Sequence, residues 1–260
     1  MNETDSLKFL FDTGANSSVI NGQSLTKLKL VLDGKSLNQG ANGSNDVESS
    51  SGNSIAYGGI AQKDILFTII PYETDVFDGV FGTNLMEGHI IEVDYNQQLL
   101  NFYAADDKSI DFEGYTPSKL YTTDYPTTIK SSVIVGKKEY TGFFGLDSGA
   151  DDALTLASPF AKKNDFIHKL PKIGAASFQG SDGLVQELPI VLLPEVQFSG
   201  MHLYRVPVAL STATEGIDAT DKLAGFYGNA FLKKFNVILD YKNHNIYFKL
   251  NKNLYREYYE

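Results

Sequence analysis

Short apolar runs separated by turn-forming residues make up most of the chain. Turn residues such as those at 96–98 and 242–245 bound several of the runs. A short run rich in β-branched or aromatic residues, flanked by such turns, is typical of a strand in a hairpin. The clearest runs of this kind occupy residues 90–93, 99–103, 129–135, 237–239 and 246–248.

Signals for helices are few and short. Ser158 followed by Pro159 is typical of an N-cap with proline at the first helical position, which predicts a helix through about residue 164. Asn21 is a candidate cap for a counterpart through about residue 28. Single helical turns are expected at residues 85–88 and 231–234. The pattern therefore predicts a mostly β protein.

The chain contains an internal repeat. An apolar run enters the sequence Asp-Thr-Gly-Ala at Asp12, and a second apolar run enters Asp-Ser-Gly-Ala at Asp147. The two aspartates are 147 − 12 = 135 residues apart, about half the chain. Fixed-distance self-similarity of this kind is the first sign of duplicated architecture.

A second pair of matched blocks supports the duplication. Gly-Val-Phe-Gly at residues 79–82 resembles Gly-Phe-Tyr-Gly at residues 225–228. In each copy an Asp-Tyr pair follows twelve residues after the second glycine, at Asp94 and Asp240. The spacing predicts two lobes of one fold in tandem.

The repeat sets the expected domain boundaries. We expect an N-terminal lobe over residues 1–104, a polar linker over 105–124 and a C-terminal lobe over 125–260. Only eleven residues precede Asp12, whereas residues 125–146 supply a full hairpin before the second motif. The first lobe is therefore expected to lack its opening strand.

Composition and charge exclude several classes of function. The 260 residues carry 22 Lys and Arg against 32 Asp and Glu, a formal net charge of −10, which disfavours nucleic acid as a partner. Cysteine is absent, so disulfides, thiol nucleophiles and zinc-thiolate sites are excluded. The four histidines are scattered without a His-x-x-x-His pair, so no metal site is expected. The longest apolar runs are too short to span a bilayer.

Two aspartate loops in related lobes could meet at a pseudo-twofold axis. Adjacent carboxylates cannot both ionise cheaply, so such a pair shares one proton and provides an acid and a base at one pH. The pair could then activate a water for attack on a peptide carbonyl. Thr13 and Ser148 could brace the loops against each other, while Gly14 and Gly149 allow close approach of the backbone.

These motifs resemble the aspartic peptidases. The two loops, each with a downstream apolar-apolar-Gly segment, are similar in arrangement to the single-chain pepsin-like enzymes, and the compact lobes are similar to retropepsin-like bacterial aspartyl proteases. The resemblance implies two homologous acid-protease-like β-barrel lobes with a cleft between them. It also implies an aspartic endopeptidase in which Asp12 and Asp147 are catalytic and no cofactor or metal is needed.

The same resemblance implies hairpin flaps over the substrate. One flap candidate comprises Gly40, Ala41, Asn42 and Gly43; the other lies around Gly180 and Gly183. Two flaps would indicate a fused retropepsin-like geometry, since pepsin-like enzymes have one. We expect a peptide or protein substrate, a monomer, and a secreted, periplasmic or lipid-anchored location.

Alternatives remain open at the level of sequence. A catalytically weak or inactive protein that binds peptides in the same fold is the main alternative. A weaker alternative is that the resemblance is limited to the turns and that the two lobes are binding modules. Tyr57 is the nearest candidate for a flap tyrosine, but it is more simply explained as a strand aromatic. Asp151 and Asp152 could raise the pKa values of the aspartate pair, but they are more simply expected to face solvent.

Overall fold

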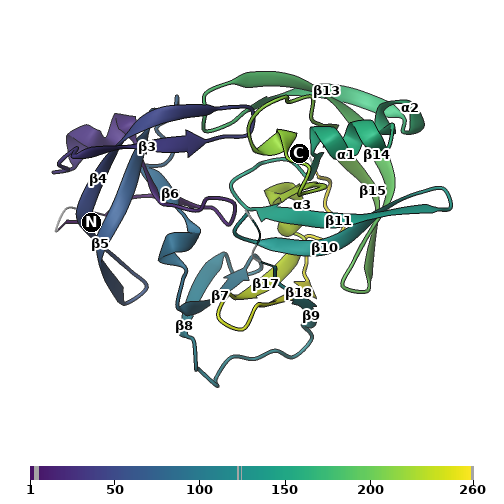
Figure 1. Cartoon of the computed structure of the whole chain (residues 1–260). Helices are drawn as coiled ribbons and strands as arrows, with labels where there is room; N and C mark the ends of the chain where they lie inside the picture. Colours follow the sequence, from purple (N-terminus) through teal and green to yellow (C-terminus); the bar gives the residue numbers. More distant parts are fainter. Residues whose placement is uncertain (3–5, 122, 124, 259–260) are drawn as a thin grey trace.

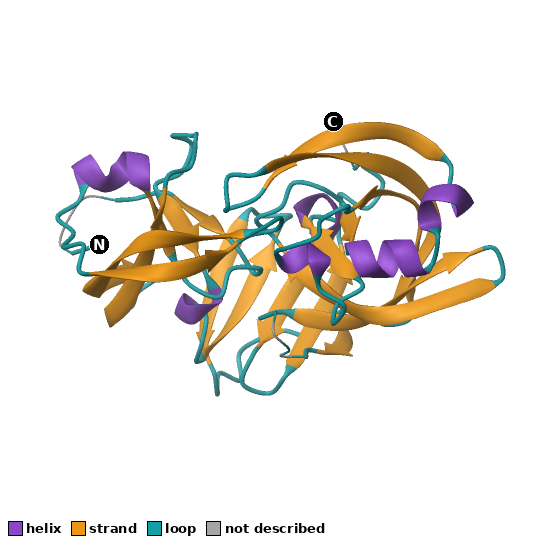
Figure 2. Cartoon of the chain, turned by 45° about the horizontal axis from the view of Figure 1, so that its top comes forward, coloured by secondary structure: helices purple, strands orange, loops and turns teal. Residues whose placement is uncertain are grey.

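The computed structural model describes residues 1–2, 6–121, 123 and 125–258. As predicted, strands dominate and the helices are short (Figure 2). Figure 1 shows one lobe built from the N-terminal half, a second from the C-terminal half, and a further sheet beneath both.

The first lobe is a six-stranded sheet. Its strand order is β1-β6-β2-β5-β4-β3, in which β1 pairs in parallel with β6, and β2 pairs in parallel with β5. The strands are β1 (Phe9–Phe11), β2 (Val19–Asn21), β3 (Gly34–Gln39), β4 (Ser44–Tyr57), β5 (Ile60–Ile70) and β6 (Gly79–Phe81).

The second lobe is a seven-stranded sheet with the order β10-β11-β16-β12-β15-β14-β13. β10 pairs with β11 along one edge and with β14 along the other, which closes the sheet into a barrel. The strands are β10 (Thr128–Val135), β11 (Lys138–Asp147), β12 (Leu154–Leu156), β13 (Lys172–Gln179), β14 (Val185–Phe198), β15 (Met201–Leu210) and β16 (Gly225–Gly228).

The two lobes repeat one topology. Strand for strand, β1-β6-β2-β5-β4-β3 corresponds to β11-β16-β12-β15-β14-β13. The described residues of the first lobe contain no counterpart of β10, so that lobe is a half-barrel beside a closed one.

A five-stranded sheet joins the lobes. Its order is β8-β7-β17-β18-β9, and the antiparallel pair β7–β17 sets Val93 opposite Val237. The strands are β7 (His89–Asp94), β8 (Leu99–Ala104), β9 (Thr116–Lys119), β17 (Phe235–Asp240) and β18 (Asn245–Leu250). Thus β9, which lies within the segment taken from sequence as a linker, is itself a strand that pairs with β18.

The helices lie close to their expected positions. Asn21 caps a 3-10 helix, η1 (Gly22–Lys27), by accepting from the Gln23 N–H at 3.1 Å. For α1 (Ser158–Lys163) the N-cap is Ala157 and not Ser158, because Ser158 already has helical geometry. The single turns begin two residues earlier than predicted. The remaining helices are η2 (Thr83–Leu85), α2 (Phe166–Lys169), η3 (Ile217–Ala219) and α3 (Asn229–Leu232).

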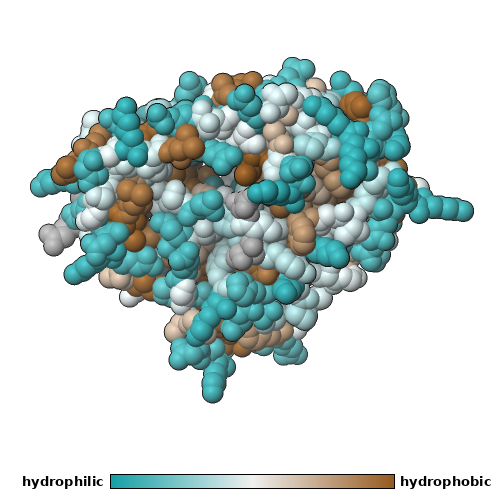
Figure 3. Space-filling model, in the orientation of Figure 1, coloured by the Kyte–Doolittle hydropathy of each residue, from teal (hydrophilic) through white to brown (hydrophobic). Residues whose placement is uncertain are grey.

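Aromatic packing fills the core of the second lobe. The Tyr227 ring stacks on Phe231 with centroids 4.3 Å apart, and Phe198 contacts Phe235 and Phe248. On the surface, apolar residues form small patches separated by hydrophilic ones on the face shown in Figure 3. No helix in the described part of the chain is long and apolar enough to cross a membrane.

Candidate active site

Both aspartate loops follow directly from paired strands. β1 ends at Phe11, and the Asp12 N–H then donates to the Phe81 carbonyl at 3.1 Å. In the second lobe, β11 ends at Asp147, which lies opposite Gly228 of β16. The apolar-apolar-Gly segments of the sequence are therefore the strands beside each loop, and they hold both loops in equivalent positions.

Four hydrogen bonds connect the two loops. The Thr13 hydroxyl donates to the Leu146 carbonyl at 2.7 Å, and the Ser148 hydroxyl donates to the Phe11 carbonyl at 2.7 Å. Each backbone N–H of the pair donates to the other residue's hydroxyl oxygen at 3.1 Å. This reciprocal brace fixes the distance between the lobes at the point where the aspartates lie.

The two carboxyl groups lie together and accept backbone N–H groups. Asp12 Oδ1 accepts from the Gly14 N–H at 2.7 Å, while Asp147 Oδ1 accepts from Gly149 and Ala150 at 3.0 and 3.1 Å. The two carboxyls are also close enough for each to perturb the ionisation of the other.

Burial controls the protonation of this pair. Loss of hydration raises the pKa of Asp12 well above its usual value, and the Asp147 charge raises it further. Burial also raises the pKa of Asp147, whereas hydrogen bonds from the Tyr125 hydroxyl and the Gly149 N–H lower it. Because two adjacent carboxyls cannot both ionise cheaply, this arrangement favours a pair that holds one proton.

The glycines of both motifs are required by space. A Cβ on Gly149 would lie 2.6 Å from Asp12 Cγ, and one on Gly14 would lie 2.8 Å from Asp147 Cγ. Each glycine thus makes room for the carboxyl of the opposite lobe, because real Cβ atoms essentially never approach so closely.

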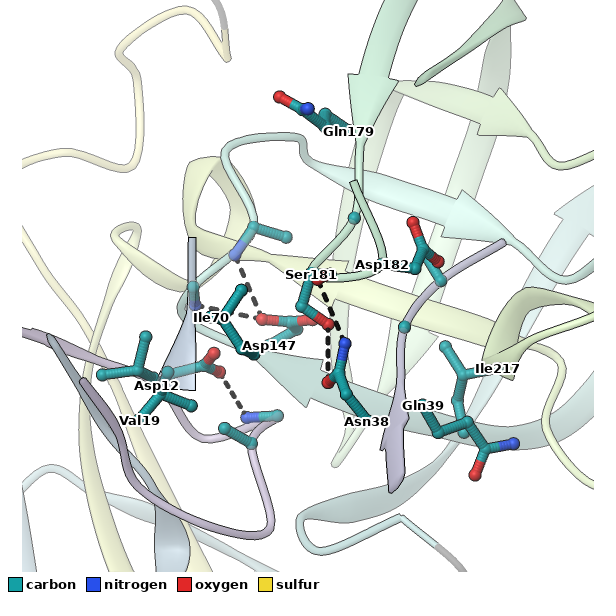
Figure 4. Close-up of a pocket in the computed structure, with 18 of the residues that line it drawn as sticks. Asp12, Val19, Asn38, Gln39, Ile70, Asp147, Gln179, Ser181, Asp182 and Ile217 are labelled. Carbon is teal, nitrogen blue, oxygen red and sulfur yellow. Dashed lines mark hydrogen bonds between the residues drawn. The ribbon is translucent and has the colours of Figure 1, made fainter. Parts of the chain in front are cut away.

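The hairpin tips from both lobes meet over the aspartates (Figure 4). The tip between β3 and β4 comprises residues 40–43, and the tip between β13 and β14 comprises residues 180–184. The Asn42 N–H donates to Asp182 Oδ2 at 2.7 Å, and Asn38 Nδ2 donates to the Ser181 carbonyl at 3.0 Å.

The first tip is also bound to the second lobe itself. The Ile217 N–H donates to the Gly40 carbonyl and the Asp218 N–H donates to the Ala41 carbonyl, both at 3.0 Å. Gly180 and Gly183 shape the second tip, where the Gly183 N–H donates to the Gly180 carbonyl at 3.0 Å. The two tips and the η3 segment together form a roof across the cleft.

Beneath this roof lies a cavity of about 640 Å³ that both aspartates line. Apolar side chains such as Val19, Ile70 and Phe226 form part of its wall. Its acidic lining residues are Asp12, Glu73, Asp147, Asp152, Asp182 and Asp218. Among the described lining residues none is Lys, Arg or His. The cavity is therefore large enough for several residues of a peptide, and its charge is negative.

Two sequence expectations near the site have different outcomes. Tyr57 is a strand aromatic, as its simpler explanation predicted, since its hydroxyl donates to the Leu85 carbonyl at 2.6 Å and its ring packs on Phe81. The expectation that Asp152 faces solvent was wrong. Its carboxyl is buried, accepts from the Thr155 hydroxyl at 2.7 Å and has its pKa raised by burial to about 7, while Asp151 is exposed as expected.

Sequence reasoning missed two further residues of the site. Tyr125 donates its hydroxyl to Asp147 Oδ2 at 3.0 Å, and Asp218 lines the cavity with its pKa raised by burial to about 7. Neither lies in a repeated motif, and no local pattern marked them. Asp218 could have been flagged only as an acidic residue seven positions before the second apolar-apolar-Gly strand.

Comparisons with known proteins agree with this architecture. Residues 1–85 match a family model described as aspartyl protease. The structure is similar to the crystal structure of aspartic proteinase from Irpex lacteus, with a TM-score of 0.56 over 97% of this chain and 92% of that chain, at 13% sequence identity. This chain has the two-lobed fold of the aspartic peptidases. A search of curated proteins gave no significant match. The family match covers the half-barrel lobe with Asp12, and the structural match covers both lobes.

Proposed function

We propose that the protein is an aspartic endopeptidase that hydrolyses peptide bonds with a water activated between Asp12 and Asp147. One observation carries the proposal: two carboxyls from equivalent loops of two lobes line one cavity together, each against the glycine of the opposite loop. Because such a pair holds one proton, it provides a base and an acid side by side.

The reaction takes two steps, and each step requires two proton transfers. In the first step the ionised carboxylate of Asp147 takes a proton from water as the water oxygen bonds to the peptide carbonyl carbon. Asp12 gives its proton to the carbonyl oxygen, so a neutral tetrahedral diol forms. In the second step Asp147 protonates the amide nitrogen, Asp12 takes a proton from a diol hydroxyl, and the C–N bond breaks. Both carboxyls then return to their starting states.

We propose further that the substrate binds in an extended form under both hairpins, in a fused retropepsin-like geometry. Two tips line the cavity, one from each lobe, and each comes from an equivalent hairpin. An extended peptide exposes N–H and C=O groups along both edges, with which hairpin backbones can pair. The tip carbonyls of Gly40 and Ala41 now accept from the second lobe, so substrate binding exchanges these bonds for bonds to the peptide.

Hydrolysis of a broad peptide library tests the function. Asp12→Asn and Asp147→Asn should each reduce turnover to background with little change in fold, because either change removes the shared proton at nearly constant volume. Asp111→Asn, at an exposed aspartate outside the cavity, is the matched control. Undiminished turnover in either site variant contradicts the proposal. No turnover in the wild type, together with binding of a statine peptide, would favour the peptide-binding alternative.

A further inference from the structure

The pseudo-twofold arrangement of the aspartates is broken by one side chain. The Tyr125 hydroxyl donates to Asp147 Oδ2 at 3.0 Å. Tyr125 lies just before β10, the strand that has no counterpart among the described residues of the first lobe. The donors to the Asp12 side chain that correspond to those on Asp147 are backbone N–H groups alone.

The position of the Tyr125 ring is built from several elements. A Cβ on Gly145 would lie 2.6 Å from the ring atom Cε1, and a Cβ on Gly14 would clash with the hydroxyl. The ring packs against Phe226 with centroids 5.0 Å apart. Two glycines, one from each lobe, therefore leave space for this phenol beside the aspartates.

The backbone of Tyr125 is held as well. Its N–H donates to the Thr123 hydroxyl at 3.2 Å, and its carbonyl accepts from the Thr128 hydroxyl at 3.3 Å. Only 5% of the residue is exposed. A buried phenol with a fixed backbone and a fixed ring holds its hydroxyl at one oxygen of Asp147.

We propose that Tyr125 is a positioning residue that makes Asp147 the proton-accepting member of the pair and leaves the shared proton on Asp12. This inference rests on the proposed peptidase function. A phenol O–H can donate to a carboxylate without itself ionising, and a donor to the charged form favours that form. The bond also restrains the Asp147 carboxylate, which lines the cavity.

The electrostatic surroundings are consistent with this role. Burial raises the pKa values of both aspartates, but the Tyr125 bond opposes this effect at Asp147 only. The charged groups acting on Tyr125 are Asp147, Asp12 and Asp218, and burial together with these carboxyls raises the pKa of the phenol well above its usual value. The phenol therefore stays protonated and remains a donor.

Among the residues that the structure describes, the other titratable groups that interact with the pair are acids and phenols. Asp152, five residues after Asp147, interacts with the Asp147 charge. Burial raises the pKa values of the Tyr72 and Tyr241 phenols, and the Asp12 charge raises both further, so both phenols stay protonated. Tyr125 is thus the side-chain hydroxyl that distinguishes the two aspartates.

Tyr125→Phe tests the inference, with Tyr227→Phe as the matched control. Tyr227 is equally buried, but its hydroxyl is bonded to Ser131 and not to an aspartate. Titration of ¹³C-carboxyl-labelled aspartate by NMR, assigned with Asp12→Asn and Asp147→Asn, should show the lower pKa of the pair rising by about one unit in Tyr125→Phe. It should not change in Tyr227→Phe.

The acid limb of the kcat/KM profile should move to higher pH by the same amount. Tyr125→Met, which also lacks a donor, serves if the phenylalanine variant does not fold. An unchanged titration, an equal shift in the control, or a downward shift overturns the inference. The NMR titration does not depend on turnover. Absence of hydrolysis would therefore contradict the proposed function, and the titration would still test the role of Tyr125.

Discussion

Thr13 and Ser148 are bonded to each other in both directions: each backbone N–H donates to the other hydroxyl oxygen at 3.1 Å. Each hydroxyl in turn donates to a carbonyl of the opposite lobe, at Leu146 and Phe11. Every polar atom of the brace is therefore satisfied across the lobe boundary. The brace lies directly beside the two aspartates, so their separation depends on it.

Removal of either hydroxyl should destabilise the protein. Thr13→Val and Ser148→Ala each leave an N–H and a carbonyl without partners, which should lower the free energy of unfolding by about 1–3 kcal/mol. Denaturant unfolding measures the loss. The double variant should lose less than the sum of the single losses, because both changes break one network.

The hydroxyl-preserving exchanges are the controls for this brace. Thr13→Ser and Ser148→Thr keep the donor and acceptor and should retain most of the stability. Strictly additive losses in the double variant would contradict a shared brace.

The brace and the aspartate pair could be predicted from the sequence, but the rest of the site could not. Matched motifs 135 residues apart predicted the lobes, the aspartate pair and the brace, since a duplicated lobe repeats both its strands and its loops. Tyr125 reaches Asp147 from 22 residues upstream and belongs to no repeated block. Its role depends on the space left by Gly14 and Gly145, which only the folded chain shows.

Asp152 illustrates a second limit. Two consecutive aspartates follow the second motif, and local sequence does not say which of them turns inward. In the fold Asp152 is buried beside Gly228 and Thr155, and Asp151 is exposed. Tertiary packing alone makes this choice.

Burial of Asp152 should make stability depend on pH. Its folded-state pKa is about 7, above the value of about 3.9 expected for the unfolded chain. Its contribution is therefore fully favourable below about pH 4 and is lost as the pH rises through about 7. In denaturant unfolding at pH 8, Asp152→Asn should have a free energy of unfolding roughly 2–4 kcal/mol higher than that of wild type. The difference should disappear near pH 4.

Asp151→Asn, at the exposed neighbour, provides the comparison for this pH effect. It removes the same charge from the same loop but should change stability by less than about 0.5 kcal/mol at either pH. A gain of equal size in both variants would show that general charge repulsion, and not burial of Asp152, is the cause.

The acidic lining of the cavity should select among substrates. Because Asp152 and Asp218 both have pKa values of about 7, the cavity becomes more negative between pH 5 and pH 8. Paired peptides that differ by Lys against Gln should show a preference for Lys that grows over this range, measured as the ratio of kcat/KM. Asp218→Asn should weaken the pH dependence of that ratio. A ratio that does not change with pH in the wild type would contradict selection by the acidic lining.

The contact between the hairpin tips should control access to the aspartates. A Cβ at Gly40 would lie 2.7 Å from Asp182 Cγ, so Gly40→Val cannot keep the tips together. Hydrogen exchange should speed up at the amides of Asn42, Ile217 and Asp218, which are bonded across the cleft in the closed form. Turnover should fall far more than thermal stability, because the tips contribute little to the core.

Gly174→Ala, in β13 of the second hairpin, is the control for this contact between the tips, since a Cβ there meets nothing within 4 Å. It should leave exchange at the three cross-cleft amides unchanged. Gly180→Val, whose Cβ would lie 3.0 Å from the Ala41 nitrogen, should resemble Gly40→Val. Exchange in the wild type with a bound statine peptide then decides between geometries: protection at both tips supports the two-flap proposal, and protection at residues 40–43 alone indicates a pepsin-like site with one flap.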